Sequence, residues 1–182
     1  MKALKNLCRA ILSLLVVCCA GALPARAAEP YYQVIDLGAL PGATWSFATG
    51  LNDEGQAVGW CWWAGTNETR AFVWLPEPAY GLAAGMHDLG TLDESWQWNP
   101  PYAEATAINN LGQVVGRSTY TSWDPGSGDC DHYDHAFVWL PEEAYGLSAG
   151  MHDLGTLAGD YDSEATDINA TGGIVGGSGI FT

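Results

Sequence analysis

Basic residues are scarce in this chain. Its 182 residues include 21 acidic side chains but only 6 lysines and arginines, which gives a formal net charge of −15 at pH 7. Proteins that bind nucleic acids through phosphate contacts present a basic surface, and proteins held on anionic lipid need a basic cluster. The composition therefore excludes both classes, and we expect no nucleic-acid partner.

A hydrophobic run long enough to cross a bilayer is also missing near the N-terminus. The apolar run Ala10–Leu23 has 14 residues, whereas a spanning helix needs about 20, so we expect no membrane span. Three basic residues precede the run, and small residues at Ala25 and Ala27 follow it. This arrangement is typical of a secretory signal peptide. We therefore interpret residues 1–27 as a signal peptide and expect an exported protein, extracellular or periplasmic.

Removal of residues 1–27 leaves few bases and few cysteines. Arg70 and Arg117 remain against 21 acidic residues, for a formal charge of −19, and only Cys61 and Cys130 remain of five cysteines. Because an exported chain enters an oxidising compartment, we expect a disulfide between these two cysteines. In the chain-entropy estimate, closing a loop of that length stabilises the fold by roughly 4 kcal/mol.

Internal repetition is the strongest pattern in the sequence. Three copies share a DLGxL block, a block that reads ATGLNDEGQAVG, ATAINNLGQVVG and ATDINATGGIVG in turn and, in the first two copies, AFVWLPExAYGL. A self-similar period of about 50 residues indicates a repeat architecture. The copies define repeat unit 1 at 34–85, repeat unit 2 at 86–150 and a partial repeat unit 3 at 151–182.

Each copy has the features of short strands joined by glycine turns. Apolar and polar residues alternate in the ATxIN block, and the turns Asn52–Gly55, Asn109–Gly112 and Asn169–Gly172 end in glycine, as common hairpin turns do. AFVWL and the DLG block supply two further strands, with Phe72, Trp74, Phe137 and Trp139 as expected core residues. We also expect a single helical turn in PExAYGL. The fold class predicted is all-β: four-stranded antiparallel blades in a partial β-propeller-like array.

The blocks His135-Ala136-Phe137, DLGTL and INxxGQVVG resemble the HAF-family probable extracellular repeat, from Val34 to about Gly176. The first copy departs from that pattern, since Arg70 replaces the histidine. The resemblance implies a bacterial, exported, propeller-like protein and no particular activity.

The number of units is too small for a closed ring. A propeller needs about four to eight blades, and the chain has two full units and a truncated third that lacks an AFVWL block. An open array leaves strand edges unpaired. Two interpretations remain open: the chain is a truncated fragment of a longer repeat protein, or other copies of the repeat assemble with it.

Aromatic residues recur in the segment between each DLGxL block and the next ATxIN block. Rings with neighbouring acceptors are typical of saccharide sites, because sugar C–H faces stack on rings and hydroxyls donate to carboxylates. The alternative is that the rings pack beneath their own loops. The candidate ligand-binding residues for a neutral glycan or another surface component are Trp45, Trp96, Trp98, Tyr102 and Tyr161.

A polar insertion between Tyr120 and His135 supplies candidate metal ligands. Carboxylates on a glycine-containing loop are suited to calcium, which takes six to eight oxygen ligands, although a solvated loop explains the composition equally well. No other cofactor is indicated. The candidate calcium ligands are Asp124, Asp129, Asp131 and Asp134.

The sequence contains no convincing catalytic constellation. The serines lack a recognisable nucleophile motif, and a phosphate-binding loop would need basic partners. We therefore expect a binding or cell-surface structural module rather than an enzyme. The alternatives are a secreted carbohydrate-active enzyme on a propeller scaffold and a non-functional fragment.

Overall fold

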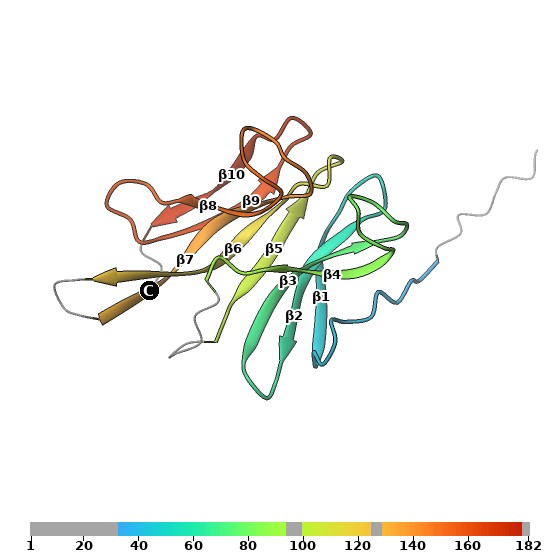
Figure 1. Cartoon of the computed structure of the whole chain (residues 1–182), viewed down its shortest axis with the longest axis horizontal. Helices are drawn as coiled ribbons and strands as arrows, with labels where there is room; N and C mark the ends of the chain where they lie inside the picture. The colour runs from blue at the N-terminus through green and yellow to red at the C-terminus, as the bar shows by residue number, and fades with distance from the viewer. Residues whose placement is uncertain (1–32, 94–99, 125–128, 180–182) are drawn as a thin grey trace, which may run out of the picture. The chain divides into compact units, whose positions relative to one another are not determined.

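The described part of the chain consists of antiparallel strands and contains no helix. The computed structural model describes residues 33–93, 100–124 and 129–179. All the strands of the described residues belong to the unit Asp36–Thr182 (Figure 1). The strands are β1 (Trp45–Leu51), β2 (Ala57–Trp63), β3 (Glu68–Leu75), β4 (Gly85–Gly90), β5 (Ala103–Ile108), β6 (Val114–Asp124), β7 (Asp129–Leu140), β8 (Gly150–Gly155), β9 (Asp162–Ile168) and β10 (Ile174–Gly179).

The strands form three sheets, which follow one another along the chain. The first sheet has the order β1-β2-β3-β4, the second has the order β5-β6-β7-β8, and the third contains only β9 and β10. All neighbouring strands are antiparallel. The all-β prediction with four-stranded antiparallel sheets is therefore confirmed for the first two sheets. No sheet is closed on itself, and no helix of the described residues is long and apolar enough to cross a membrane.

The DLG block ends a sheet instead of beginning one. β4 and β8, which carry this block, pair with the preceding AFVWL strands β3 and β7. The first copy, Val34–Leu40, was expected to be a strand, and this prediction is wrong. The physical reason is that a strand needs a partner, and no AFVWL segment precedes this copy within the described residues.

The three expected hairpin turns are confirmed. In each turn the glycine N–H donates to the asparagine carbonyl three residues earlier, at 3.0–3.1 Å. Gly55, Gly112 and Gly172 have φ of 73°, 75° and 82°, the left-handed conformation that glycine adopts without a steric penalty. The asparagine side chain also accepts the N–H at the start of the return strand, as Asn52 does from Gln56.

The expected helical turn in PExAYGL is instead a two-residue β-turn. Ala79 and Leu82 exchange both backbone hydrogen bonds, at 3.1 and 2.8 Å. Tyr80 and Gly81 between them have φ of 54° and 74°, which is the pattern of a type I′ turn. The copy at Ala144–Leu147 repeats the same bonds. The early proline predicted a helical turn. The hydroxyl of Tyr80 also bonds to the side chain of Gln56, and this tertiary contact favours the β-turn.

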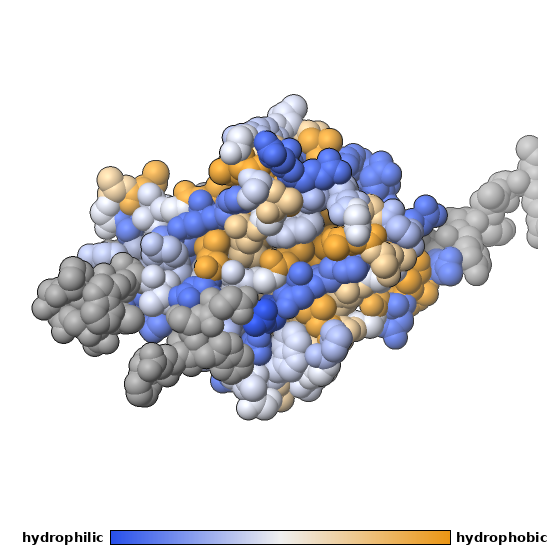
Figure 2. Space-filling model, in the orientation of Figure 1, coloured by the Kyte–Doolittle hydropathy of each residue, from blue (hydrophilic) through white to orange (hydrophobic). Residues whose placement is uncertain are grey.

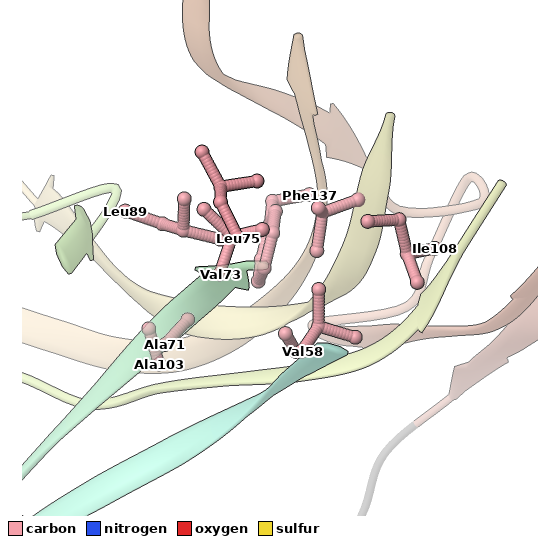
Figure 3. Packing of buried hydrophobic residues seen from close by; sticks show 10 residues of the cluster. Val58, Ala71, Val73, Leu75, Leu89, Ala103, Ile108 and Phe137 are labelled. Carbon is pink, nitrogen blue, oxygen red and sulfur yellow. The ribbon is translucent and has the colours of Figure 1, made fainter. Parts of the chain in front are cut away.

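Two aromatic residues of the AFVWL blocks are core residues, as predicted. Phe72 is 1% exposed and Phe137 is 0% exposed, whereas Trp74 and Trp139 are half-buried and pack at the border of the clusters. Phe137 belongs to the second sheet, yet it lies among Val58, Val73 and Leu75 of the first sheet (Figure 3). The largest hydrophobic cluster therefore joins two sheets.

A repeated set of hydrogen bonds also joins each sheet to the next. The hydroxyl of Thr49 donates to the carbonyl of Ala105 at 2.6 Å, and that of Thr106 donates to the carbonyl of Ala165 at 2.7 Å. In the turns, the amide of Asn52 donates to the carbonyl of Asn109 at 2.9 Å. Asn109 repeats this contact to the carbonyl of Asn169 at 3.0 Å.

Candidate functional site

Four aromatic side chains form a surface on the first sheet, which we call the aromatic platform: Trp45, Phe47, Trp60 and Trp62. The register of β1 and β2 places Trp45 opposite Trp62 and Phe47 opposite Trp60. The Trp45 and Trp62 ring centroids are 5.1 Å apart, and the Phe47 and Trp60 rings stack at 4.5 Å. Directly opposed aromatic pairs stabilise an antiparallel sheet, so the platform is held in a defined geometry.

The platform faces solvent along β1. Trp45 is 57% exposed and Phe47 is 48% exposed, while Trp60 and Trp62, opposite them on β2, are half-buried. The opposite face of β2 is buried, since Cys61 packs with Leu40 and Phe72. The ring-bearing face of β2 also packs on the second sheet through Val58. The platform is therefore the exposed continuation of a packed face. An exposed group of aromatic rings of this kind is typical of a recognition surface.

The second sheet has charged side chains at positions where the first sheet has the aromatic platform. Glu104 and Arg117 are cross-strand partners there, as Phe47 and Trp60 are in the first sheet. Arg117 binds Glu104 at 3.1 Å and donates to the Tyr102 hydroxyl at 2.6 Å. Its guanidinium carbon also lies 5.2 Å from the centre of the Tyr102 ring. The third sheet has Glu164 opposite Gly177 at this point, so these positions vary between units.

We call Tyr102, Glu104, Arg117 and Asp134 the charged cluster. Burial raises the pKa of the Tyr102 phenol, Glu104 raises it further, and Arg117 opposes the shift. Burial likewise raises the pKa of the Asp134 carboxyl, although Arg117, with Nη1 at 3.7 Å from Asp134 Oδ2, lowers it. One guanidinium therefore serves a phenol and two carboxylates, so the cluster has one more carboxylate than it has bases.

The structure separates the predicted saccharide residues. Trp45 lies on the aromatic platform, and Tyr102 lies in the charged cluster. Tyr161 is 51% exposed and stacks on Tyr133 of β7 at 5.2 Å. Trp96 and Trp98 lie outside the described residues.

Sequence reasoning missed three of the four platform residues. Trp60 and Trp62 share a face of an alternating strand, a pattern that fits core packing equally well. The pairing of β1 with β2 brings them together with Trp45. The sequence does contain a signal for this arrangement: Trp45 and Phe47 come shortly before the turn Asn52–Gly55, and Trp60 and Trp62 come shortly after it. Two strands joined by that turn bring such residues opposite one another.

The predicted calcium residues do not form a loop. Apart from residues 125–128, the insertion extends β6 and β7 into a long hairpin, with Ser122 opposite Asp131 and Thr119 opposite Asp134. Asp131 and Asp134 are three positions apart in β7 and lie on opposite faces of the strand. The side chains of Asp124 and Asp129 lie outside those that the structure describes. Among described side chains, no group of three or more histidines, cysteines or acids could hold a metal ion.

The expected disulfide is not formed, because Cys61 is a free, buried thiol. Its sulfur accepts the backbone N–H of Leu40 at 3.5 Å. Ser118 and Ser178 occupy the equivalent positions and accept the N–H of Leu92 and Leu157 at 2.9 and 3.0 Å. Cys61 therefore serves the scaffold inside its own sheet, and burial raises the pKa of its thiol.

The repeated aspartates also serve the scaffold. Asp36, Asp88 and Asp153 each accept the N–H of the glycine two residues later, at 2.7–2.9 Å. All three copies keep the aspartate and use it in the same way, so its role is structural. What differs between copies is therefore a better guide to function than what recurs.

No known family, curated protein or solved structure matches the chain. The resemblance to HAF repeats thus rests on the motifs themselves.

Proposed function

We propose that the chain is an exported repeat protein that binds a neutral saccharide on the aromatic platform. In this proposal the three sheets are blades of a propeller-like array, and the first blade carries the ligand site. The single observation that carries the proposal is the pair of cross-strand aromatic contacts on β1 and β2, with Trp45 57% and Phe47 48% exposed.

The chemistry of the platform favours an uncharged ligand with an apolar face. The C–H face of a pyranose packs on an aromatic ring, and two adjacent ring pairs offer room for consecutive sugar units. The chain carries a net charge of −15, which repels acidic polymers. A neutral oligosaccharide combines the required apolar face with the absence of charge.

The variation between units supports a role beyond folding. The matching cross-strand positions hold an ion pair in the second sheet and a glutamate opposite glycine in the third. An aromatic pair is therefore not needed at this point to build a sheet of this repeat. Its presence on an exposed face of the first sheet alone is better explained by a ligand.

The test is a calorimetric titration of the protein with neutral oligosaccharides such as cello-, xylo- and manno-oligosaccharides. We expect saturable binding to at least one of them, weakened about tenfold or more in Trp45→Ala/Phe47→Ala. The matched control is Leu111→Ala, which removes an apolar side chain that is 54% exposed in a turn of the second sheet and should leave affinity unchanged.

Circular dichroism of each variant confirms that the fold is retained. The proposal fails if no neutral oligosaccharide binds, or if the double variant binds as tightly as the unaltered protein.

A further inference from the structure

The outer edge of β10 is unpaired within the described residues. In the first two sheets the equivalent strands, β2 and β6, pair on both sides, with β1 and β3 and with β5 and β7. β10 pairs only with β9. A free edge presents a row of backbone N–H and C=O groups that can pair with another strand.

The register of the other sheets specifies which strand fits this edge. Val58 lies opposite Val73 and Gly59 opposite Phe72; in the second sheet Val115 and Gly116 lie opposite Val138 and Phe137. Val175 and Gly176 occupy the matching positions in β10. An AFVWL segment in the same register places its valine opposite Val175 and its phenylalanine opposite Gly176.

A cavity is present where that phenylalanine would lie. Its volume is about 400 Å³, and its lining includes Leu154, Ala165, Ile174 and Gly176. In the complete sheet Phe137 belongs to one cluster with Leu89, Ala105 and Val114. The first three lining residues are the repeat equivalents of these three. The cavity therefore has the lining of the Phe137 site without the phenylalanine.

The exposure of Leu154 agrees with a missing strand. Val175 is 62% exposed, whereas its equivalents Val58 and Val115 are fully buried. Leu154 is 44% exposed, whereas its equivalent Leu89 is 6% exposed. Leu154, the equivalent of a residue that packs with Phe137, is thus uncovered. Val58 and Val115 are buried against the sheet that follows theirs, so the exposure of Val175 reflects the lack of such a sheet within the described residues.

We propose that the edge of β10, together with this cavity, binds an extended apolar strand of the AFVWL type from another repeat-bearing polypeptide. The incoming strand pairs antiparallel with β10 and inserts its phenylalanine between β8 and β10. This is strand addition, in which backbone hydrogen bonds provide affinity and a side-chain pocket provides specificity. The site is separate from the aromatic platform and does not depend on the saccharide proposal.

The probe is a fluorescein-labelled peptide that copies residues 134–143, DHAFVWLPEE. We expect saturable binding to the full chain by fluorescence anisotropy, and slower hydrogen exchange of the β10 amides when the peptide is bound. A peptide with aspartate in place of the phenylalanine should bind at least tenfold more weakly, because a carboxylate does not enter an apolar cavity without cost.

Variants of the protein locate the site. Val175→Asp changes an exposed side chain of β10 and should lower the affinity for the peptide at least tenfold. If this variant does not fold, Leu154→Glu on β8 should lower the affinity by a similar factor. Leu111→Asp, a change of similar size outside the site, should have no effect. Trp45→Ala/Phe47→Ala should bind the peptide normally, so failure of this proposal is distinguishable from failure of the saccharide proposal.

The proposal is overturned if the peptide does not bind, or if it binds without slowing exchange in β10. It is also overturned if binding is unchanged in both Val175→Asp and Leu154→Glu.

Discussion

At the scale of single residues, Tyr80 shows how a tertiary contact selects a turn. A φ of 54° is unfavourable for tyrosine. The hydroxyl of Tyr80 bonds to the Gln56 side chain at 3.1–3.2 Å. The ring lies so close to Gly112 of the next unit that an added Cβ would be 2.3 Å from that hydroxyl. Tyr145 repeats the arrangement with Gly172.

Because of this contact, we expect two glycine substitutions with the same backbone strain to lower the free energy of unfolding by different amounts. Gly112 and Gly81 have φ of 75° and 74°, but a Cβ at Gly81 meets no atom within 4 Å. Gly81→Ala should cost about 1–2 kcal/mol for the left-handed conformation. Gly112→Ala should cost a further ~1–3 kcal/mol, because the methyl group displaces Tyr80. Urea unfolding measures both, and equal losses would show that Tyr80 does not join the two units.

Cys61 leads to a second prediction at this scale. Because Ser118 and Ser178 accept the equivalent backbone N–H, Cys61→Ser should keep the free energy of unfolding within about 1 kcal/mol of the unaltered value. Cys61→Ala should lose more, about 1–3 kcal/mol, because the buried N–H of Leu40 loses its acceptor. If serine were no better than alanine in chemical denaturation, the sulfur would not act as an acceptor.

At the scale of elements, the hairpin turns that end in glycine could be predicted from the sequence, whereas the turn at Tyr80 and the conformation of the first DLG block could not. The turn Asn52–Gly55 depends on a glycine with positive φ and an asparagine that bonds nearby backbone, and both are local. The segment Val34–Leu40 has the same DLG block as β4 but no AFVWL strand beside it. Its conformation therefore depends on residues that are distant in sequence, which pattern analysis does not supply.

The same distinction explains the candidate site. Trp45 was predicted from its place between two blocks, whereas the aromatic platform depends on the register of β1 and β2. The sequence predicted a loop in the insertion between Tyr120 and His135, either a calcium site or a solvated loop, because acids dominate its composition. Cross-strand pairs such as Thr119 with Asp134 extend the ladder in spite of that composition.

Asp134 in this hairpin gives a pH prediction. Burial raises its pKa above the unfolded value near 3.8, so its contribution to stability is fully present below that value. The contribution is lost as the pH rises through the folded pKa. Asp134→Asn should therefore gain stability relative to the unaltered protein as the pH rises from about 3 to 7.

The measurement is urea unfolding across that pH range. Asp131→Asn, which removes one exposed carboxylate from the same strand, controls for the change in net charge. A difference between Asp134→Asn and the unaltered protein that stays constant with pH would contradict the assignment.

At the scale of the whole molecule, recurring contacts and varying contacts serve different purposes. The threonine, asparagine and tyrosine contacts between units recur, and they use the same positions each time. The surface shows apolar and polar residues side by side (Figure 2). Two apolar features stand apart from the recurring set: the aromatic platform at the first sheet and the uncovered edge of the third. We assign the ligand to the first and a partner strand to the second.

The measurement that tests the ligand assignment most directly is a saccharide titration followed by the indole N–H resonances of the tryptophans in a ¹H–¹⁵N spectrum. We predict that the Trp45, Trp60 and Trp62 resonances, assigned by single substitution to phenylalanine, shift and saturate together. The resonances of Trp74 and Trp139, which border the core clusters, should remain in place. If no indole resonance moves, or if Trp74 and Trp139 move while the platform resonances do not, the platform is not a saccharide site.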